Sequence, residues 1–246
     1  MRRSVSVAAR VWAVVFVALV GVHLVALLAG ADDLATVSQW TLMPALAAVV
    51  ATATRWPRGR VVTWTLVALG FSWLGDLLPS LVGEDTSFLV MVGCFLFAQL
   101  AYVVAFAPAA RRSVLHTRRV LLIPYAVVLV GLIALCAPGA EALLVPVAVY
   151  GGVLVAMAVL ATGLGRMAAV GGAVFLVSDS LIALEAFVPW WDLAGQDFWV
   201  MLTYTVGQGL LAAAVVRGNL TERRTPTPVR TNTQRPPVPD NVVAFV

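Results

Sequence analysis

The 246 residues of the chain are 61% hydrophobic and only 11% charged. Soluble globular domains carry about 25% charged residues, so this composition excludes a water-soluble fold and predicts an integral membrane protein. The net charge of +4 comes from Arg in short clusters between apolar stretches, which indicates membrane topology, and we expect no nucleic-acid partner. Abundant Ala, Val and Arg without any Lys are typical of a GC-rich bacterial genome.

Eight apolar runs follow one another along the chain, each long enough to cross the hydrocarbon core, which needs about 20 residues. They cover residues 9–29, 36–54, 61–80, 87–109, 119–137, 141–162, 166–188 and 197–216. The breaks between them hold turn residues or charges, and short connections favour antiparallel neighbours. The sequence therefore predicts an all-α fold, a polytopic bundle of eight transmembrane helices within residues 1–220.

The charged residues in the breaks alternate in sign. Arg occurs before the first run and after the second, fourth, sixth and eighth, whereas the other breaks hold acidic residues such as Asp32, Glu84 and Asp192. Because Arg is retained on the cytoplasmic side of a membrane, this pattern predicts cytoplasmic N and C termini and a multi-pass protein of the inner (plasma) membrane.

The two ends of the chain carry their own signals. Arg2 and Arg3 precede an apolar run that ends in Ala29-Gly30-Ala31, so a cleaved signal peptide is the rival interpretation of the first helix, and cleavage would leave seven helices. The run from residue 11 to residue 28 is rather long for a signal peptide, which favours a retained helix. Residues 221–246 are rich in Pro, Thr and Arg, a composition that predicts a disordered cytoplasmic tail.

Three acidic residues, Asp76, Asp179 and Glu185, lie inside predicted spans. A charged side chain at a helix centre costs about 2.5–3.5 kcal/mol on insertion scales, so such residues usually face the bundle interior and mark a functional site. The alternative is a structural contact between helices. Ser72 lies one turn before Asp76 and is expected to bond its carboxyl, while Gly75 allows a close approach.

Asp76 and Asp179 occupy similar positions in the third and seventh predicted helices. Both helices run in the same direction and both residues lie beyond the middle of their spans, so they are expected at one depth. An internal four-plus-four duplication would explain this likeness. Glu185 follows Asp179 by six positions, about 240° around the helix, and is expected to face elsewhere, nearer the outer interface.

Several other polar side chains are predicted at buried depth, and they suggest a polar cavity beside the carboxyls. The candidate substrate-binding residues are Ser72, Gln99, Tyr102, Tyr150, Ser178, Tyr204 and Gln208. Interhelical hydrogen bonding is the competing explanation for them. The two Cys and two His residues are isolated in the sequence, so no metal site is expected, and nothing indicates a cofactor.

These polar segments resemble the YhhN/TMEM86 family of eight-helix membrane proteins. The most specific matches are Phe71-Ser-Trp-Leu-Gly-Asp76 and Gly172-Ala-Val-Phe-Leu-Val-Ser-Asp179, and the weaker ones include Phe97-Ala-Gln-Leu-Ala-Tyr102, Tyr150 and Tyr204-Thr-Val-Gly-Gln208. Two departures occur: the family's usual Lys-Pro reads Met43-Pro44 here, and a common His is Gln99.

The resemblance implies a lysoplasmalogenase, an enzyme that hydrolyses the vinyl ether bond of a lysoplasmalogen or a related membrane lysolipid. Asp76 and Asp179 would then be the catalytic acid and base, because a carboxylic acid can protonate the vinyl carbon while a carboxylate directs water. The sequence does not say which Asp has which role. A proton-coupled small-molecule transporter, which also needs buried carboxyls, and a purely structural membrane protein remain the alternative functions.

Overall fold

The computed structural model describes residues 6–222, and this part of the chain is helical, with no β-strand. The predicted tail, apart from its first two residues, lies outside the described residues. Within residues 6–222, eight α-helices of 18 to 27 residues form the fold: α1 (Val7–Ala29), α2 (Asp32–Ala53), α3 (Arg60–Leu77), α4 (Glu84–Phe106), α6 (Leu122–Ala140), α7 (Leu144–Ala161), α8 (Arg166–Phe187) and α9 (Gln196–Glu222). The short helix α5 (Val114–Thr117) lies in the connection between α4 and α6.

The helix ends differ from the predicted runs for local chemical reasons. The predicted second run begins at residue 36, but α2 starts at Asp32, because Asp32 and Asp33 in its first turn complement the positive end of the helix dipole. The predicted break at Pro138-Gly139 does not end α6, which continues to Ala140. The chain turns instead at Glu141, whose φ of 42° is incompatible with a continuing helix.

Seven helical stretches among the described residues are long and apolar enough to cross a membrane. The longest, Arg119–Leu164, is one continuous helical stretch, although it contains both α6 and α7 with the turn at Glu141 between them. The all-helical fold of a membrane protein is therefore confirmed. The count of eight crossings stays a prediction.

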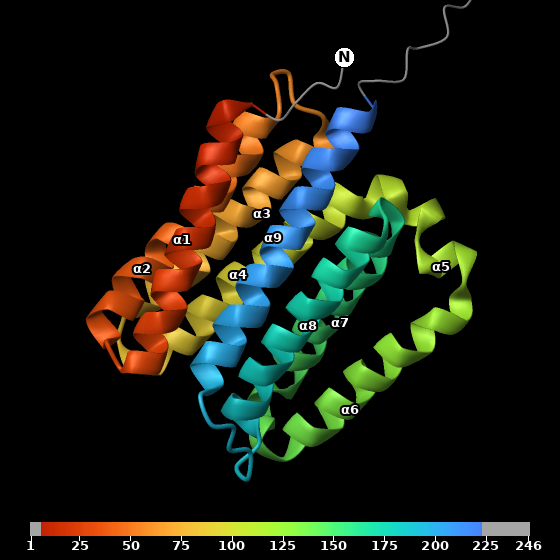
Figure 1. Ribbon diagram of the computed structural model, residues 1–246. Helices are drawn as coiled ribbons and strands as arrows, with labels where there is room; N and C mark the ends of the chain where they lie inside the picture. Colours follow the sequence, from red (N-terminus) through yellow and green to blue (C-terminus); the bar gives the residue numbers. More distant parts are fainter. Residues whose placement is uncertain (1–5, 223–246) are drawn as a thin grey trace, which may run out of the picture.

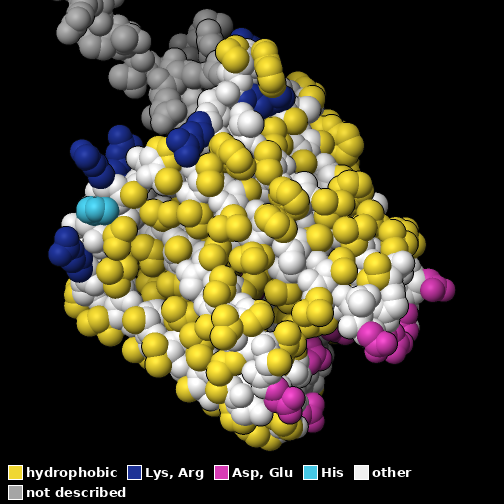
Figure 2. All heavy atoms as spheres, turned by 180° about the vertical axis from the view of Figure 1, so that it is seen from behind, with side chains coloured by type: hydrophobic (Ala, Val, Ile, Leu, Met, Phe, Trp, Pro, Cys, Tyr) yellow, Lys and Arg dark blue, Asp and Glu magenta, His cyan; other side chains and the backbone are white. Residues whose placement is uncertain are grey.

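The helices form a bundle in which α1 packs on α2, α3 on α4 and α8 on α9 (Figure 1). Helix α1 begins and α9 ends at the same end of the bundle. Figure 2 shows Arg side chains gathered toward that end, Asp and Glu side chains at the opposite end, and a broad hydrophobic belt between them. This distribution agrees with the alternation in the sequence, while the assignment of the Arg-rich end to the cytoplasm stays a prediction.

Helix α6 packs mainly against α7 and α8 and stands apart from them toward the end that carries α5 (Figure 1). Its two buried residues, Cys136 and Ala140, lie near the other end, where they pack against Phe187 and Val188. The main core is built by the remaining helices. At the other end of α6, Tyr125 packs against the main core.

Candidate active site

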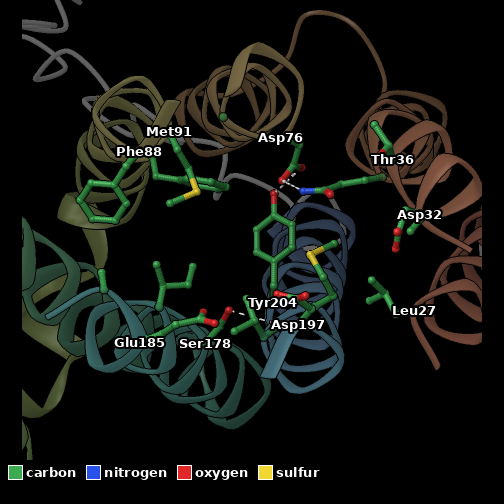
Figure 3. A pocket seen from close by; sticks show the side chains of 18 residues that line it. Leu27, Asp32, Thr36, Asp76, Phe88, Met91, Ser178, Glu185, Asp197 and Tyr204 are labelled. Atoms are coloured by element: carbon green, nitrogen blue, oxygen red, sulfur yellow. Dashed lines mark hydrogen bonds between the residues drawn. The ribbon is translucent and has the colours of Figure 1, made fainter. Parts of the chain in front are cut away.

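Asp76 lies near the end of α3 and is 6% exposed. The Tyr204 hydroxyl of α9 donates a hydrogen bond to its Oδ2 at 2.9 Å, and the Gln39 amide of α2 donates one to its Oδ1 at 3.3 Å. Gly75 lets the Phe95 ring approach, since a Cβ on Gly75 would lie 2.9 Å from that ring. The carboxyl of Asp76 is thus held by donors from two other helices (Figure 3).

Asp179 has a similar environment in α8, where it is 7% exposed. The Tyr150 hydroxyl of α7 donates to its Oδ2 at 2.6 Å. The Gln99 amide of α4 lies beside Asp179 and Tyr150, but neither its nitrogen nor its oxygen has a hydrogen-bond partner among the described residues. Each Asp therefore has one Tyr donor and one nearby Gln, which is the likeness that an internal duplication would leave.

Two adjacent cavities meet these carboxyls. The larger one, of about 540 Å³, is lined by Gln39, Asp76 and Tyr204 together with side chains of α1, α4 and α8 (Figure 3). The smaller one, of about 70 Å³, is lined by Tyr150 and Asp179 among apolar side chains of α4, α6, α7 and α8. Four residues border both cavities: Phe88, Met91, Phe95 and Ile182. Asp76 and Asp179 thus line two neighbouring cavities that share four apolar lining residues.

The larger cavity carries further carboxyls toward the acidic end of the bundle. Asp32, Glu185 and Asp197 line it around Leu27, Thr36 and Ser178 (Figure 3), whereas no described Arg or His side chain does. Glu185 faces a different cavity from Asp179, as its helical position predicts. It nevertheless lines the same cavity as Asp76. The sequence did not reveal this placement, because that cavity is built by several helices that lie far apart in the sequence.

The predicted hydrogen bond from Ser72 to Asp76 is wrong. Both oxygens of Asp76 are bonded by Tyr204 and Gln39, and Ser72 instead accepts a hydrogen bond from Gln208 at 3.0 Å. The Gln208 amide oxygen in turn accepts a hydrogen bond from Tyr102. Ser72, Tyr102 and Gln208 are fully buried and line neither cavity, so the structure places them in a network that joins α3, α4 and α9.

The other predicted substrate-binding residues lie closer to the cavities. Tyr150 and Tyr204 line them directly, and Ser178 lines the larger one while donating to the Val200 carbonyl at 3.0 Å. Gln99 lines neither cavity but lies beside Asp179. The structure brings four of the seven predicted residues next to a carboxyl or a cavity, and their role in substrate binding stays a prediction.

Gln39 is the site residue that sequence reasoning missed. It lies in α2, only a few residues inside the predicted second span, where an uncharged polar side chain is inexpensive and gives a weak signal. Its partner, Asp76, is 37 positions away, and only the packing of α2 on α3 brings the two together. Met43, which departs from the family pattern, is buried in the main core and lines neither cavity.

The His and Cys residues lie outside both cavities. His23 is buried and its Nδ1 bonds Ser38 at 2.9 Å, which joins α1 to α2. Cys136 is buried in the small cluster with Phe187. In the described part of the chain, no group of three or more His, Cys, Asp and Glu side chains is placed to hold a metal ion.

Comparison with known proteins gives a consistent picture. The family model described as the YhhN family matches residues 34–215, which include both Asp residues and the Tyr and Gln side chains beside them. Proteins named lysoplasmalogenase from Mycobacterium bovis and Mycobacterium tuberculosis are each 31% identical over 176 residues, covering 65% of this chain and 67% of theirs. No solved structure matches the chain significantly.

Proposed function

The chain belongs to the YhhN family, and we propose that it is an intramembrane hydrolase that cleaves the vinyl ether bond of a lysoplasmalogen or a related lysolipid. The observation that carries the proposal is the pair of buried carboxyls, Asp76 and Asp179, on adjacent cavities. The likeness to the mycobacterial proteins named lysoplasmalogenase also supports this proposed function.

The proposed chemistry needs one proton donor and one proton acceptor. A neutral carboxyl protonates a vinyl carbon and leaves an oxocarbenium ion, and a carboxylate takes a proton from the water that adds to this ion. The resulting hemiacetal collapses to a fatty aldehyde and a glycerophospho-base. Asp76 and Asp179 supply the two carboxyls, and Tyr204 and Tyr150 hold them in place.

The two cavities fit the two halves of a lysolipid. The larger cavity, with its polar groups and outer carboxyls, suits the glycerol and a head group that carries a cation, because four acidic side chains and no described basic one line it. The smaller, apolar cavity suits the first carbons of the chain. Leu89, which lines the smaller cavity, is 52% exposed, so the rest of the chain can extend into the lipid.

The membrane topology is part of the same proposal. We place eight crossings in the bacterial inner (plasma) membrane, with α6 and α7 as separate spans and the Arg-rich end in the cytoplasm. In this orientation Asp76, Asp179 and the outer carboxyls lie in the outer half of the bundle, where a lysolipid head group of the outer leaflet is accessible.

Aldehyde release tests the proposed activity. Purified protein in detergent is incubated with a lysoplasmenyl lipid and, as the control, with the matching lysolipid that carries an ester in place of the vinyl ether. We expect aldehyde from the first and no fatty acid from the second, because protonation of carbon needs the electron-rich double bond. Fatty acid release from the ester, or no product from either lipid, would contradict the proposal.

Enlarging Gly75 is expected to slow the reaction without removing a functional group. A Cβ at Gly75 would lie 2.9 Å from the Phe95 ring, and Phe95 borders both cavities. Gly75→Ala therefore pushes this ring toward the substrate, and we expect kcat/KM for aldehyde release to fall about 10- to 100-fold, as for a reactant displaced by about 1 Å. Gly70→Ala in the same helix meets open space and should leave kcat/KM unchanged; equal effects of the two variants would argue against this geometry.

A further inference from the structure

A chain of hydrogen bonds reaches Asp76 from three fully buried side chains that line neither cavity: Tyr102, Gln208 and Ser72. The Tyr102 hydroxyl donates to the Gln208 amide oxygen, and the Gln208 amide nitrogen donates to the Ser72 oxygen at 3.0 Å. The Ser72 hydroxyl is in turn a hydrogen-bond partner of Tyr204. Tyr204 donates to Oδ2 of Asp76 at 2.9 Å (Figure 3), so the chain ends on a carboxyl of the site.

The chain is built on two facing helices, α3 and α9. Ser72 and Asp76 lie one turn apart on α3, and Tyr204 and Gln208 lie one turn apart on α9, a spacing that places each pair on one face of its helix. The later residue on α9 bonds the earlier one on α3. The hydrogen bonds therefore pass from α9 to α3, back to α9 and again to α3, one helical turn nearer to the carboxyl.

All donors in the chain point toward Asp76. Because Gln208 donates to the Ser72 oxygen, the Ser72 proton is left for Tyr204. Tyr204 gives its own proton to the hydrogen bond with Asp76, so its oxygen is able to accept. Hydrogen bonds in a row polarise one another, and a hydroxyl that accepts one becomes a stronger donor. A contact that only cross-links helices requires neither this common direction nor a last acceptor in the site.

We propose that Ser72, Gln208 and Tyr102 are positioning residues that act on the Asp76 carboxyl through Tyr204. The chain fixes the direction of the Tyr204 hydroxyl and strengthens its hydrogen bond, so the carboxyl keeps one orientation at the larger cavity. A group that transfers a proton must keep such an orientation, because small displacements of reacting atoms are costly. The effect on catalysis rests on the proposed function, and it is the same whether Asp76 is the acid or the base.

Single and double substitutions test whether Ser72 acts through Tyr204. Ser72→Ala should lower kcat for aldehyde release about 10-fold, near the upper end of what one neutral hydrogen bond contributes. KM should stay at its wild-type value, because Ser72 lines neither cavity. In a Tyr204→Phe background, adding Ser72→Ala should lower kcat by less than about twofold, because the link to Asp76 is already cut and the two effects are not additive.

Thr65→Val is the matched control. Thr65 is as buried in α3 as Ser72, and its hydroxyl has no hydrogen-bond partner among the described residues. The substitution removes a buried hydroxyl and keeps the shape of the side chain, so kcat and KM should both equal the wild-type values.

Infrared spectra give a readout that does not depend on activity. The band of the Asp76 carboxyl is identified by its loss in Asp76→Asn. This band should shift in Ser72→Ala, because the hydrogen bond from Tyr204 becomes weaker, and it should not move in Thr65→Val.

Three outcomes would overturn the proposal: losses from Ser72→Ala and Tyr204→Phe that multiply in the double variant, a raised KM with unchanged kcat in Ser72→Ala, or a carboxyl band that does not move. If Ser72→Ala elutes as an aggregate in detergent, Tyr102→Phe, which removes a single oxygen atom from the chain, replaces it in the same comparisons. Absence of aldehyde from the wild type refutes the proposed function, and the infrared band then decides whether the chain acts on Asp76. Wild-type hydrolysis with multiplied losses refutes only the positioning role.

Discussion

Asp76→Asn and Asp179→Asn are each expected to lower kcat/KM for aldehyde release by about 10²–10⁴-fold, the range for loss of a general acid or base. Asn has nearly the shape of Asp, and its amide oxygen can still accept the hydrogen bond from Tyr204 or Tyr150. The loss therefore reports the missing proton transfer more than a change of packing. Initial rates with a lysoplasmenyl lipid at saturating and limiting concentrations give kcat and KM separately.

Asp33→Asn is the matched control for these two variants. Asp33 is exposed in the first turn of α2 and lines neither cavity, so this substitution removes a carboxyl from the same end of the bundle without touching the site. Its kcat/KM should equal that of the wild type. If Asp76→Asn and Asp179→Asn both kept wild-type activity, a two-carboxyl mechanism would be ruled out, although the protein would still be an enzyme.

The helices were predictable because a span needs a long apolar run, and a run of that length can be read directly from the sequence. Their ends were less predictable. Helix α2 begins at Asp32 because acidic residues stabilise a helix start, whereas the prediction treated the same residues as a break. Helix α6 passes through Pro138, since the fold supplies the reversal at Glu141 instead.

The site was predictable only where burial is expensive. Asp76 and Asp179 were visible because a carboxyl in an apolar run has a high free-energy cost and is kept for a reason. Gln39 gave almost no signal, although it donates to Asp76. Helical spacing placed Ser72 on the face of Asp76, but it did not reveal that Gln208, 136 positions later, would bond Ser72. Contacts between distant helices decide these choices, and no local pattern encodes them.

Gly207 lies where α9 packs closely on α8, so a methyl group at this position should destabilise the bundle. A Cβ on Gly207 would lie 2.9 Å from the Phe175 nitrogen and 3.0 Å from the Gly171 oxygen. These are backbone atoms, so no side chain can rotate away and the two helices must separate. We expect Gly207→Ala to lower the free energy of unfolding by about 1–3 kcal/mol, the usual cost of overpacking, and to lower the thermal midpoint measured in detergent.

Gly209→Ala, on the same helix, is the matched control and is not expected to lower the free energy of unfolding. A Cβ there meets only the Phe16 ring, at 3.6 Å, which is an ordinary contact, so the substitution should be neutral or stabilise by up to about 1 kcal/mol through helix propensity. Equal midpoints for the two variants would contradict the close packing of α8 on α9.

The packing of α8 on α9 also positions a residue of the site. Tyr204 lies on α9 with its ring against Phe175 of α8, and its hydroxyl donates a hydrogen bond to Asp76. Gly207→Ala should therefore reduce kcat/KM as well as stability, whereas Gly209→Ala should change neither the Tyr204 contact nor the rate.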